Sequence, residues 1–596
     1  MEVLMRLRKA LFLLLFVLFS LYSAFGMTVE EAKLAIQENF QAGNPGSAIN
    51  IANFFKDTDP EFKRLAFIAS VKAANTRYAG RLLPFKNPDA ELNFYLGRYY
   101  EEMGNLTKAI EVYTSFKGDN MFAAVSYYQA GRCAERKGEL DKAEMYYDMA
   151  LAQERTFKSA LYAIARLKEK TGQKDAATKI RKGNYTPKAK GTGYYVPPAG
   201  TKTKTLPANF TGKKSGKIVR ACLAEGIRSF NVTDSQTKEV LNIKYEKNAI
   251  CIYSNNKLIK SLSNSYRISN KSSNGTLKLT GIKGWMEGSQ FRGDIEVKIK
   301  NKALMIINHI DLEEYLYGVL PSEMYPDWPY ESLKAQAVAA RSYILNRMLT
   351  PESNEYDVYV GKNTAYRGYN REKQQTTLAV HETFGIALFT PQGTPFDAVF
   401  STSSGGYTSI SATAWNSGKV DYLTAVPDKK IKKNTAPPSP GQVAEFIKNP
   451  PPMYCYVAPY AAYQAFRWCI QYTREELENL VDPQHTIGFI KGIQVNSRDI
   501  SGRVTKLTVQ GTLGVMVIGS RDIRERLGKL KSSLFVCEYQ LARNGLPDTF
   551  MFIGGGWGHG VGLDQTGAAG MAASGIGFKD ILKHYYPEAI IKNKCY

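Results

Sequence analysis

Residues 311–347, DLEEYLYGVLPSEMYPDWPYESLKAQAVAARSYILNR, place two helix-like segments around one short, proline-bracketed turn. Asp311 is suited to cap the first helix, and Pro321 is expected to end it. The second helix is expected to begin at Pro329, since a residue in a first helical turn needs no N–H donor. The sequence therefore predicts that Glu323 lies in the turn, between two anchored helices.

Glu323 is followed by Met324 and Tyr325, with Trp328 a few residues further on. Partial removal of a carboxyl group from water raises its pKa, which suits the group to proton donation near neutral pH. Most glutamates in turns are simply solvated, however. The local pattern alone leaves both a catalytic and a solvated acid open.

Length and charge limit the class of protein. A chain of 596 residues is too long for one core and predicts several units. The 78 Lys and Arg against 55 Asp and Glu give a formal charge of +23. The electrostatic field of this positive charge favours an anionic partner, whether nucleic acid, a membrane surface or an acidic wall polymer.

Residues 1–26 resemble a secretory signal peptide, with basic residues before an apolar run at 10–21 and the small-x-small pattern Ala24-Phe25-Gly26. The rival interpretation is an uncleaved anchor, but the run is short for a bilayer span. No later stretch has the pattern of a transmembrane segment. We therefore expect export to the periplasm or cell wall, which argues against a nucleic-acid partner.

The seven cysteines are scattered singly, without C-x-x-C spacing. This spacing argues against a structural zinc site, and no metal or cofactor is predicted. In an exported protein some of the cysteines are candidates for disulfides, but the sequence does not assign the pairs.

Residues 27–180 have a helical pattern that repeats every 34 residues. Gly97, Gly104, Ala109 and Tyr113 map onto Gly131, Gly138, Ala143 and Tyr147. These segments resemble tetratricopeptide repeats, in which small residues let paired helices approach closely. A superhelical groove of this kind typically binds a peptide or protein segment, and we predict a protein partner. The alternative is that the repeats serve only as a spacer.

Residues 181–216 form a predicted flexible basic linker, rich in Lys, Gly and Pro and without acids. From residue 217 to about 309, short alternating runs separated by Asn, Gly and Ser clusters predict successive strands. Residues 426–500 are less regular and are interpreted as an insertion. The predicted fold class is multidomain: an all-α tetratricopeptide-like superhelix followed by an α+β domain at 217–596.

Two glycine-rich motifs follow the second helix. The turn at Ser401–Gly406 offers backbone N–H groups to a ligand, or is an ordinary tight turn. The stretch GWGHGVGLDQTGAAG lacks the lysine of a phosphate-binding loop. Its Trp557, His559 and Gln565 are residue types that recognise sugars, against the alternative of simple loop packing.

The four motifs YLYGVLPSEM, ESLKAQAVAARSY, SSGGYTS and GWGHGVGLDQTGAAGMA, in this order, resemble the SpoIID/LytB family over residues 217–596. That family includes the stage II sporulation protein D, a lytic transglycosylase of peptidoglycan, and the amidase enhancer, a modifier of wall hydrolysis. The resemblance thus implies either an enzyme or an auxiliary protein.

The resemblance makes Glu323 the catalytic acid and Arg341 a basic residue needed for activity. The guanidinium of Arg341 is expected to point at a sugar substituent or at Glu323. The residues implied to line a glycan cleft are Ser404, Gly405, Gly406, Trp557, His559 and Gln565.

The sequence departs from the family at three places. Tyr407 stands where the family often has His, and residues 351–375 lack the His and Cys of a zinc site found in a sporulation member. Thr424 stands where the family has a Lys, so the chain lacks a cation to which the resemblance assigns a supporting role in catalysis.

The predicted function is a peptidoglycan-binding lytic transglycosylase that cleaves glycan strands between N-acetylmuramic acid and N-acetylglucosamine and forms anhydromuramyl products. The alternative is a non-catalytic amidase enhancer or wall-binding scaffold that recruits another hydrolase through its repeats.

Overall fold

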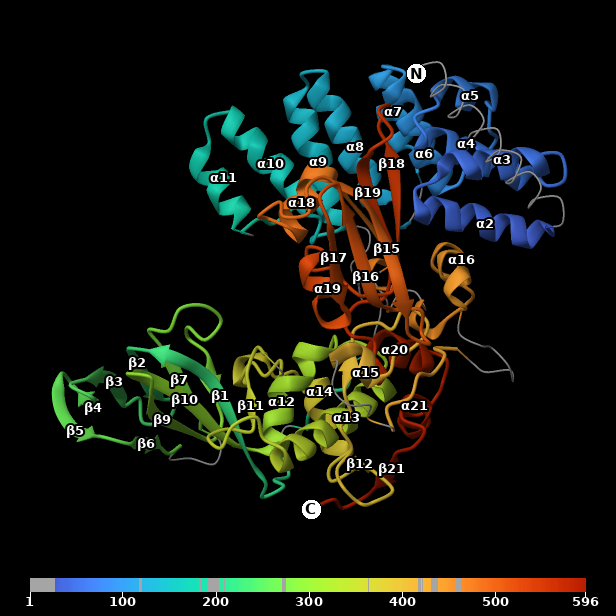
Figure 1. Ribbon diagram of the computed structural model, residues 1–596. Coiled ribbons are helices and arrows are strands. Elements are labelled where there is room, and N and C mark those ends of the chain that lie inside the picture. The colour runs from blue at the N-terminus through green and yellow to red at the C-terminus, as the bar shows by residue number, and fades with distance from the viewer. Residues whose placement is uncertain are drawn as a thin grey trace. The chain divides into compact units, whose positions relative to one another are not determined.

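The computed structural model of the chain is shown in Figure 1. It describes residues 27–116, 120–182, 184–189, 203–207, 210–270, 275–362, 364–415, 420, 422–429, 438–456, 460 and 463–596. The predicted signal peptide at 1–26 lies outside the described residues, as does part of the predicted linker. Among the described residues, no helix is both long and apolar enough to cross a membrane.

The chain forms two compact units and passes between them more than once. Unit 1 comprises Met1–Tyr195, Thr402–Val420 and Pro427–Gly560. Unit 2 comprises Val196–Ser401, Asp421–Val426 and Val561–Tyr596. The domain boundaries given by the sequence stay predictions.

The first part of unit 1 is helical, as predicted, and the helices follow one another in antiparallel pairs. They are α2 (Val29–Ala42), α3 (Pro45–Phe55), α4 (Pro60–Lys72), α5 (Thr76–Arg81), α6 (Ala90–Glu102), α7 (Leu106–Thr114), α8 (Ala123–Arg136), α9 (Leu140–Gln153), α10 (Lys158–Lys170) and α11 (Lys174–Arg181).

The 34-residue period reflects one contact that recurs in successive pairs. A Cβ atom on Gly97 in α6 would lie 2.4 Å from the ring of Tyr113 in α7, and one on Gly131 in α8 would lie 2.6 Å from the ring of Tyr147 in α9. Both tyrosines are buried. Each glycine thus lets the tyrosine of the partner helix lie directly on the backbone, which explains the repeated Gly–Tyr spacing.

The rest of unit 1 carries two antiparallel three-stranded sheets, ordered β14-β19-β18 and β15-β16-β17. The strands are β14 (Arg467–Thr473), β15 (Ile490–Arg498), β16 (Val504–Gly511), β17 (Val515–Gly519), β18 (Phe535–Leu541) and β19 (Pro547–Gly555). The helices are α15 (Ser411–Trp415), η2 (Pro440–Gln442), α16 (Val443–Lys448), η3 (Tyr454–Tyr456), α17 (Tyr463–Phe466), α18 (Arg474–Val481) and α19 (Ser520–Arg526).

The first sheet packs against one face of the helical repeats, and the two share one core (Figure 1). The contacts come from the first helix of successive pairs. They are Lys72 of α4 to Glu538 (2.6 Å), Arg98 of α6 to Gln540 (2.8 Å), Gln129 of α8 to Gln471 (3.1 Å) and Ser159 of α10 to the carbonyl of Gln471 (3.0 Å). Much of this face is therefore occupied by strands β14 and β18 of the same chain.

Unit 2 begins with the predicted strands. One sheet has the order β11-β1-β10-β9-β6 and another β5-β4-β3-β2-β7-β8, and short pairs join β12 to β21 and β13 to β20. The strands are β1 (Ile218–Ile227), β2 (Ser229–Asp234), β3 (Val240–Glu246), β4 (Ala249–Ser254), β5 (Lys257–Leu262), β6 (Ser265–Ile268), β7 (Leu277–Thr280), β8 (Gln290–Phe291), β9 (Asp294–Lys300), β10 (Ala303–Asp311), β11 (Val358–Tyr359), β12 (Ala387–Phe389), β13 (Phe400–Ser401), β20 (Leu563–Asp564) and β21 (Ile590–Lys592).

The first helix of unit 2 follows strand β10 directly, and the other helices come later in the chain. The helices are α12 (Leu312–Glu323), α13 (Tyr330–Leu349), η1 (Tyr369–Arg371), α14 (Gln374–Glu382), α20 (Gln565–Ala573) and α21 (Phe578–Tyr585). Helix α13 contacts α12, α14, α20 and α21. The fold is thus an all-α repeat region followed by an α+β region, which confirms the predicted class.

The Gly–Tyr contact can be tested with Gly131→Ala. The added methyl group would overlap the ring of Tyr147, and overpacking of this kind costs about 1–3 kcal/mol. The matched control is Gly46→Ala in α3, where an added Cβ meets nothing within 4 Å. We expect Gly131→Ala to lower the thermal midpoint of unit 1 and Gly46→Ala to leave it unchanged or raise it; equal midpoints would contradict the role of the contact.

Candidate functional site

Glu323 is the last residue of helix α12, and its side chain is partly exposed. Asp311 caps the start of this helix by accepting a hydrogen bond from the N–H of Glu313 at 2.9 Å. The prediction that Pro321 ends the helix is wrong, because Pro321 lies inside its last turn. A proline there removes one donor, while the N–H of Met324 still donates to the carbonyl of Leu320 at 3.0 Å. Glu323 is therefore held by a helix rather than by a turn.

Gln565 is the residue that the fold brings to Glu323. Its Nε2 donates to Oε2 of Glu323 at 3.2 Å, although the two residues are far apart in the sequence. Gln565 opens helix α20, whose preceding residue Asp564 caps it by accepting from the N–H of Gly567 at 2.8 Å. The cap fixes the start of α20 and with it the backbone that carries Gln565. Two of the motif residues thus form one contact within unit 2.

The surroundings of Glu323 favour its protonated form. Burial raises the pKa of Glu323, and the hydrogen bond from Gln565 partly opposes this by stabilising the carboxylate. The net pKa lies above the ordinary value of a glutamate. A partly exposed carboxyl group with a raised pKa is equipped to donate a proton to a ligand and to accept one later.

Arg341, in contrast, is completely buried and does not face Glu323. Its Nε and Nη2 donate to the two carboxylate oxygens of Glu313 at 2.6 and 2.9 Å. Its remaining donors reach the carbonyls of Val380 (3.1 Å) and Ile386 (3.0 Å). The expectation that this guanidinium points at Glu323 or at a sugar is therefore not met, because the buried carboxylate of Glu313 is the nearer and less solvated partner.

The Arg341–Glu313 pair lies at the opposite end of α12 from Glu323. Ten residues of α-helix span about 15 Å, so the guanidinium acts on Glu323 only through the helix. The hydroxyl of Tyr596 also donates to Glu313. The pair anchors the first turn of α12 against α13 and α14.

The two glycine-rich motif segments of unit 1 bind to each other through their backbones. Ser403 and Trp557 exchange N–H to carbonyl hydrogen bonds of 3.0 and 2.9 Å. A Cβ on Gly405, whose φ is +74°, would lie 2.6 Å from the nitrogen of Gly556. Only glycine permits this approach.

The predicted donors of the turn are used inside it. The N–H of Gly405 donates to Oγ of Ser403 at 3.3 Å, and that of Gly406 donates to Oγ of Ser404 at 3.1 Å. Ser404 itself is buried. These residues therefore shape the loop.

The exposed groups of these loops are aromatic. Trp557 is 40% exposed, and the ring of His559 lies 5.0 Å from that of Trp415, which is exposed to the same extent. Nζ of Lys531 lies 4.6 Å from the centre of the Trp557 ring and pairs with Glu154 of the repeats at 2.6 Å. The exposed indole faces are suited to stacking on sugar rings.

Sequence reasoning missed Trp415 and Lys531. Trp415 ends the stretch SSGGYTSISATAW, so its closeness in sequence to the SSGGYTS motif was the signal that could have identified it. Lys531 lies in the stretch GKLKSS, which carries no pattern, and its partner Glu154 comes from the repeats. Thr424, at the position of the family lysine, is partly exposed in unit 2.

Comparison with known proteins agrees with these motifs. The family model described as "Stage II sporulation protein" matches residues 300–389, and the one described as "Domain of unknown function (DUF8618)" matches residues 410–562. The "Stage II sporulation protein D" of Bacillus amyloliquefaciens is 30% identical over 301 residues, which cover 47% of this chain and 74% of that protein.

The "Amidase enhancer" of Bacillus subtilis (strain 168) is 26% identical over 297 residues, covering 46% of this chain and 39% of that protein. The crystal structure of MamA covers 26% of this chain and 93% of its own, with 21% identity and a TM-score of 0.23.

The fold and the motifs define a multidomain protein in which a helical-repeat region accompanies an α+β domain with a helix-borne acid. The chain belongs to the family of the stage II sporulation protein D.

The buried Arg341–Glu313 pair predicts a large stability effect. Arg341→Ala leaves the carboxylate of Glu313 buried without its cation, which costs about 3–5 kcal/mol. The control is Lys362→Ala, which removes an exposed pair with Glu352 and should cost about 1 kcal/mol or less. Hydrogen exchange of the α12 and α13 amides measures both effects. Equal protection in the two variants would contradict the anchoring role.

The contact between Gln565 and Glu323 predicts a change in titration. In Gln565→Leu the carboxylate loses a donor that stabilises it, so the pKa of Glu323 should rise further. Infrared titration of carboxyl groups measures this, with Glu323→Gln used to assign the signal. An unchanged or lowered midpoint would show that Gln565 does not act on this carboxyl group.

Proposed function

We propose that this protein is an exported, peptidoglycan-binding lytic transglycosylase that cleaves glycan strands and releases anhydromuramyl products. The observation that carries the proposal is the partly exposed carboxyl group of Glu323, whose pKa is raised and which accepts a hydrogen bond from a second family motif. Membership in the family of the stage II sporulation protein D supports the same assignment.

In the proposed mechanism the neutral carboxyl group of Glu323 protonates the glycosidic oxygen between N-acetylmuramic acid and N-acetylglucosamine. The resulting carboxylate then removes the proton of the muramyl 6-hydroxyl, whose oxygen closes the anhydro ring on the anomeric carbon. Ordinary glycosidases need two opposed carboxylates, one of which activates water or acts as nucleophile. An internal hydroxyl removes that need, so a single carboxyl group is sufficient.

The electrostatics around Glu323 are consistent with this one-carboxyl scheme. Its pKa responds to burial and to Gln565, and no second carboxylate among the described residues contributes.

Arg341 enters the proposal as a positioning residue that acts through Glu313 and the axis of α12. We further propose that Trp557 and His559 contact glycan, while Ser404, Gly405 and Gly406 shape the supporting turn, and that the helical repeats contribute a protein-binding surface.

A second candidate function is that of a non-catalytic enhancer of a wall amidase. Two observations favour it: Thr424 replaces the family lysine, and one relative carries the name "Amidase enhancer". In this case the carboxyl group of Glu323 would be dispensable, and the protein would act by binding wall and enzyme together.

Glu323→Gln in the full chain separates the two candidates. Loss of general acid–base help costs about 10²–10⁴ in rate, so release of anhydromuropeptides from purified sacculi should nearly cease while binding to sacculi persists. The control Glu352→Gln changes a glutamate in a surface pair and should retain activity. Products are identified by mass spectrometry.

Full release by Glu323→Gln would sink the catalytic assignment. Release that requires an added amidase, with no anhydro products from the chain alone, would establish the enhancer instead.

A further inference from the structure

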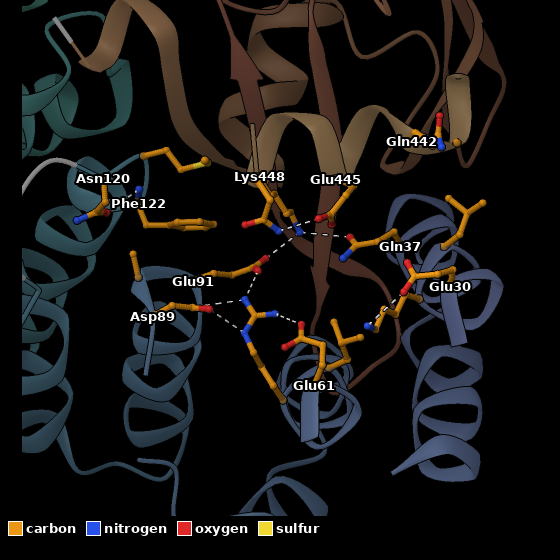
Figure 2. A pocket seen from close by; sticks show the side chains of 18 of the residues that line it. Glu30, Gln37, Glu61, Asp89, Glu91, Asn120, Phe122, Gln442, Glu445 and Lys448 are labelled. Carbon is orange, nitrogen blue, oxygen red and sulfur yellow. Dashed lines mark hydrogen bonds and ion pairs between the residues drawn. The ribbon is translucent and has the colours of Figure 1, made fainter. Parts of the chain in front are cut away.

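Beside strand β18, the helical repeats border a cavity of about 660 Å³ within unit 1. Helices α2, α4 and α6 line one side, and η2 and α16 line the other (Figure 2). The neighbouring face of the repeats is occupied by β14 and β18. The cavity is thus a part of the repeat region that the strands of the same chain leave open.

A closed network of charges forms the inner wall of the cavity. Nζ of Lys448 contacts Glu91 at 2.8 Å, Glu538 at 2.8 Å and Gln37 at 3.3 Å, and its side chain is only 7% exposed. Arg64 pairs in turn with Glu91. Figure 2 shows Glu91 and Gln37 directed at the Lys448 amine. The charges in this part of the wall are therefore already paired with one another.

The lining of the cavity as a whole carries unbalanced negative charge. The cations that line the cavity are Lys33, Arg64 and Lys448, and each is paired with a carboxylate. The carboxylates that line it are Glu30, Glu31, Glu61, Asp89, Glu91 and Glu445. Three charges of each sign cancel, and three negative charges remain. This excess is notable in a chain whose formal charge is +23.

Two of the acids face the solvent with little compensation. Glu30 is 85% exposed and lies 3.6 Å from Lys33, whose closer partner is Asp59 at 2.8 Å. Glu445 accepts from the amide of Asn449 at 3.0 Å and has no ion pair among the described residues. These carboxylates can pair with an incoming cation at little cost in existing bonds.

The remaining lining suits a peptide. Leu34, Leu65, Met121 and Phe122 offer apolar surface for the aliphatic stems of long side chains. The Nδ2 of Asn120 is a buried donor with no acceptor among the described residues, and it can donate to a backbone carbonyl. The volume falls in the range of ligand pockets and accommodates several residues.

We propose that this cavity binds a lysine- or arginine-containing segment of a partner protein. The proposal rests on the protein-binding role proposed above for the repeats and does not depend on chemistry at Glu323. The cationic side chains lie against Glu30 and Glu445, and their stems cover the apolar wall. A backbone carbonyl of the partner accepts a hydrogen bond from the amide of Asn120.

The test uses the full chain and a fluorescein-labelled hexapeptide of alternating lysine and alanine, with a glutamate–alanine hexapeptide as the matched probe. Fluorescence anisotropy measures binding. We expect the lysine peptide to bind more tightly than the glutamate peptide, and less tightly at high ionic strength, because exposed charges are screened.

The double variant Glu30→Gln/Glu445→Gln should bind the lysine peptide about three- to tenfold more weakly, the effect of two partly screened ion pairs. The control Glu111→Gln/Glu169→Gln makes the same change of charge on repeat helices outside the cavity and should bind as the unchanged protein does. Equal binding of the two peptides, or no effect of the cavity variant, would overturn the proposal.

Displacement of the lysine probe by spermidine as effectively as by unlabelled peptide would show a polyamine site and overturn the peptide assignment. Release of anhydromuropeptides is measured in the same preparations, and the cavity variant should release them at the unchanged rate. A failure of peptide binding and a failure of glycan cleavage are therefore distinguished.

Discussion

The completely buried pair of Glu313 and Arg341 is the constraint on which the acid-bearing part of the fold depends. Two opposite charges in the interior are tolerated only when their geometry satisfies every donor and acceptor. The guanidinium meets this condition by bonding both carboxylate oxygens and the carbonyls of Val380 and Ile386. These bonds hold α12, α13 and α14 against one another. The direction of α12 follows, and with it the place of Glu323 at the other end of the helix.

A similar constraint operates in unit 1, where the repeats meet the sheet. Lys72 and Lys448 lie against Glu91 and Glu538, so two cations and two carboxylates cancel in the interior. Although burial alone would raise the pKa of Glu91, the charges of Lys448 and Arg64 lower it. Glu91 therefore stays ionised, and the register of β18 against α4 and α6 is specified by charge as well as by packing. Repeats held in this way act as a scaffold for the strands.

Part of this architecture could be predicted from the sequence. The repeats could be predicted because the contact of Gly131 with Tyr147 recurs at a fixed period. A contact that recurs in this way produces a periodic pattern in the sequence. Glu323 and Gln565 could be predicted as site residues because each lies in a family motif, although the two motifs are far apart in the sequence. Neither inference required knowledge of the packing.

The predictions that failed have other causes. The direction of Arg341 depends on the buried carboxylate of Glu313 and on the carbonyls of Val380 and Ile386, which are distant from it in the sequence. The contact of Lys531 with Glu154 joins the sheet-bearing segment to the repeats and leaves no local trace. Pro321 was expected to end a helix, yet the bond from Met324 to Leu320 closes the last turn without its N–H. For Arg341 and Lys531 a tertiary partner decides the contact, whereas at Pro321 a local helical bond keeps the last turn closed.

The net positive charge of the chain and the negative charge of the cavity suit different partners. A formal charge of +23 creates a long-range field that attracts an anionic polymer and repels a cationic partner at a distance. The cavity beside α16 has the opposite sign, and its field outweighs that of the net charge only close to the cavity, because salt screens both fields over a Debye length of about 10 Å. A cationic segment must therefore arrive with enough apolar and backbone contact to offset the repulsion, whereas a free amine gains only the local attraction. This difference favours a peptide over a small cation, and it allows an anionic polymer and a cationic partner to bind one chain without competing for the same charges.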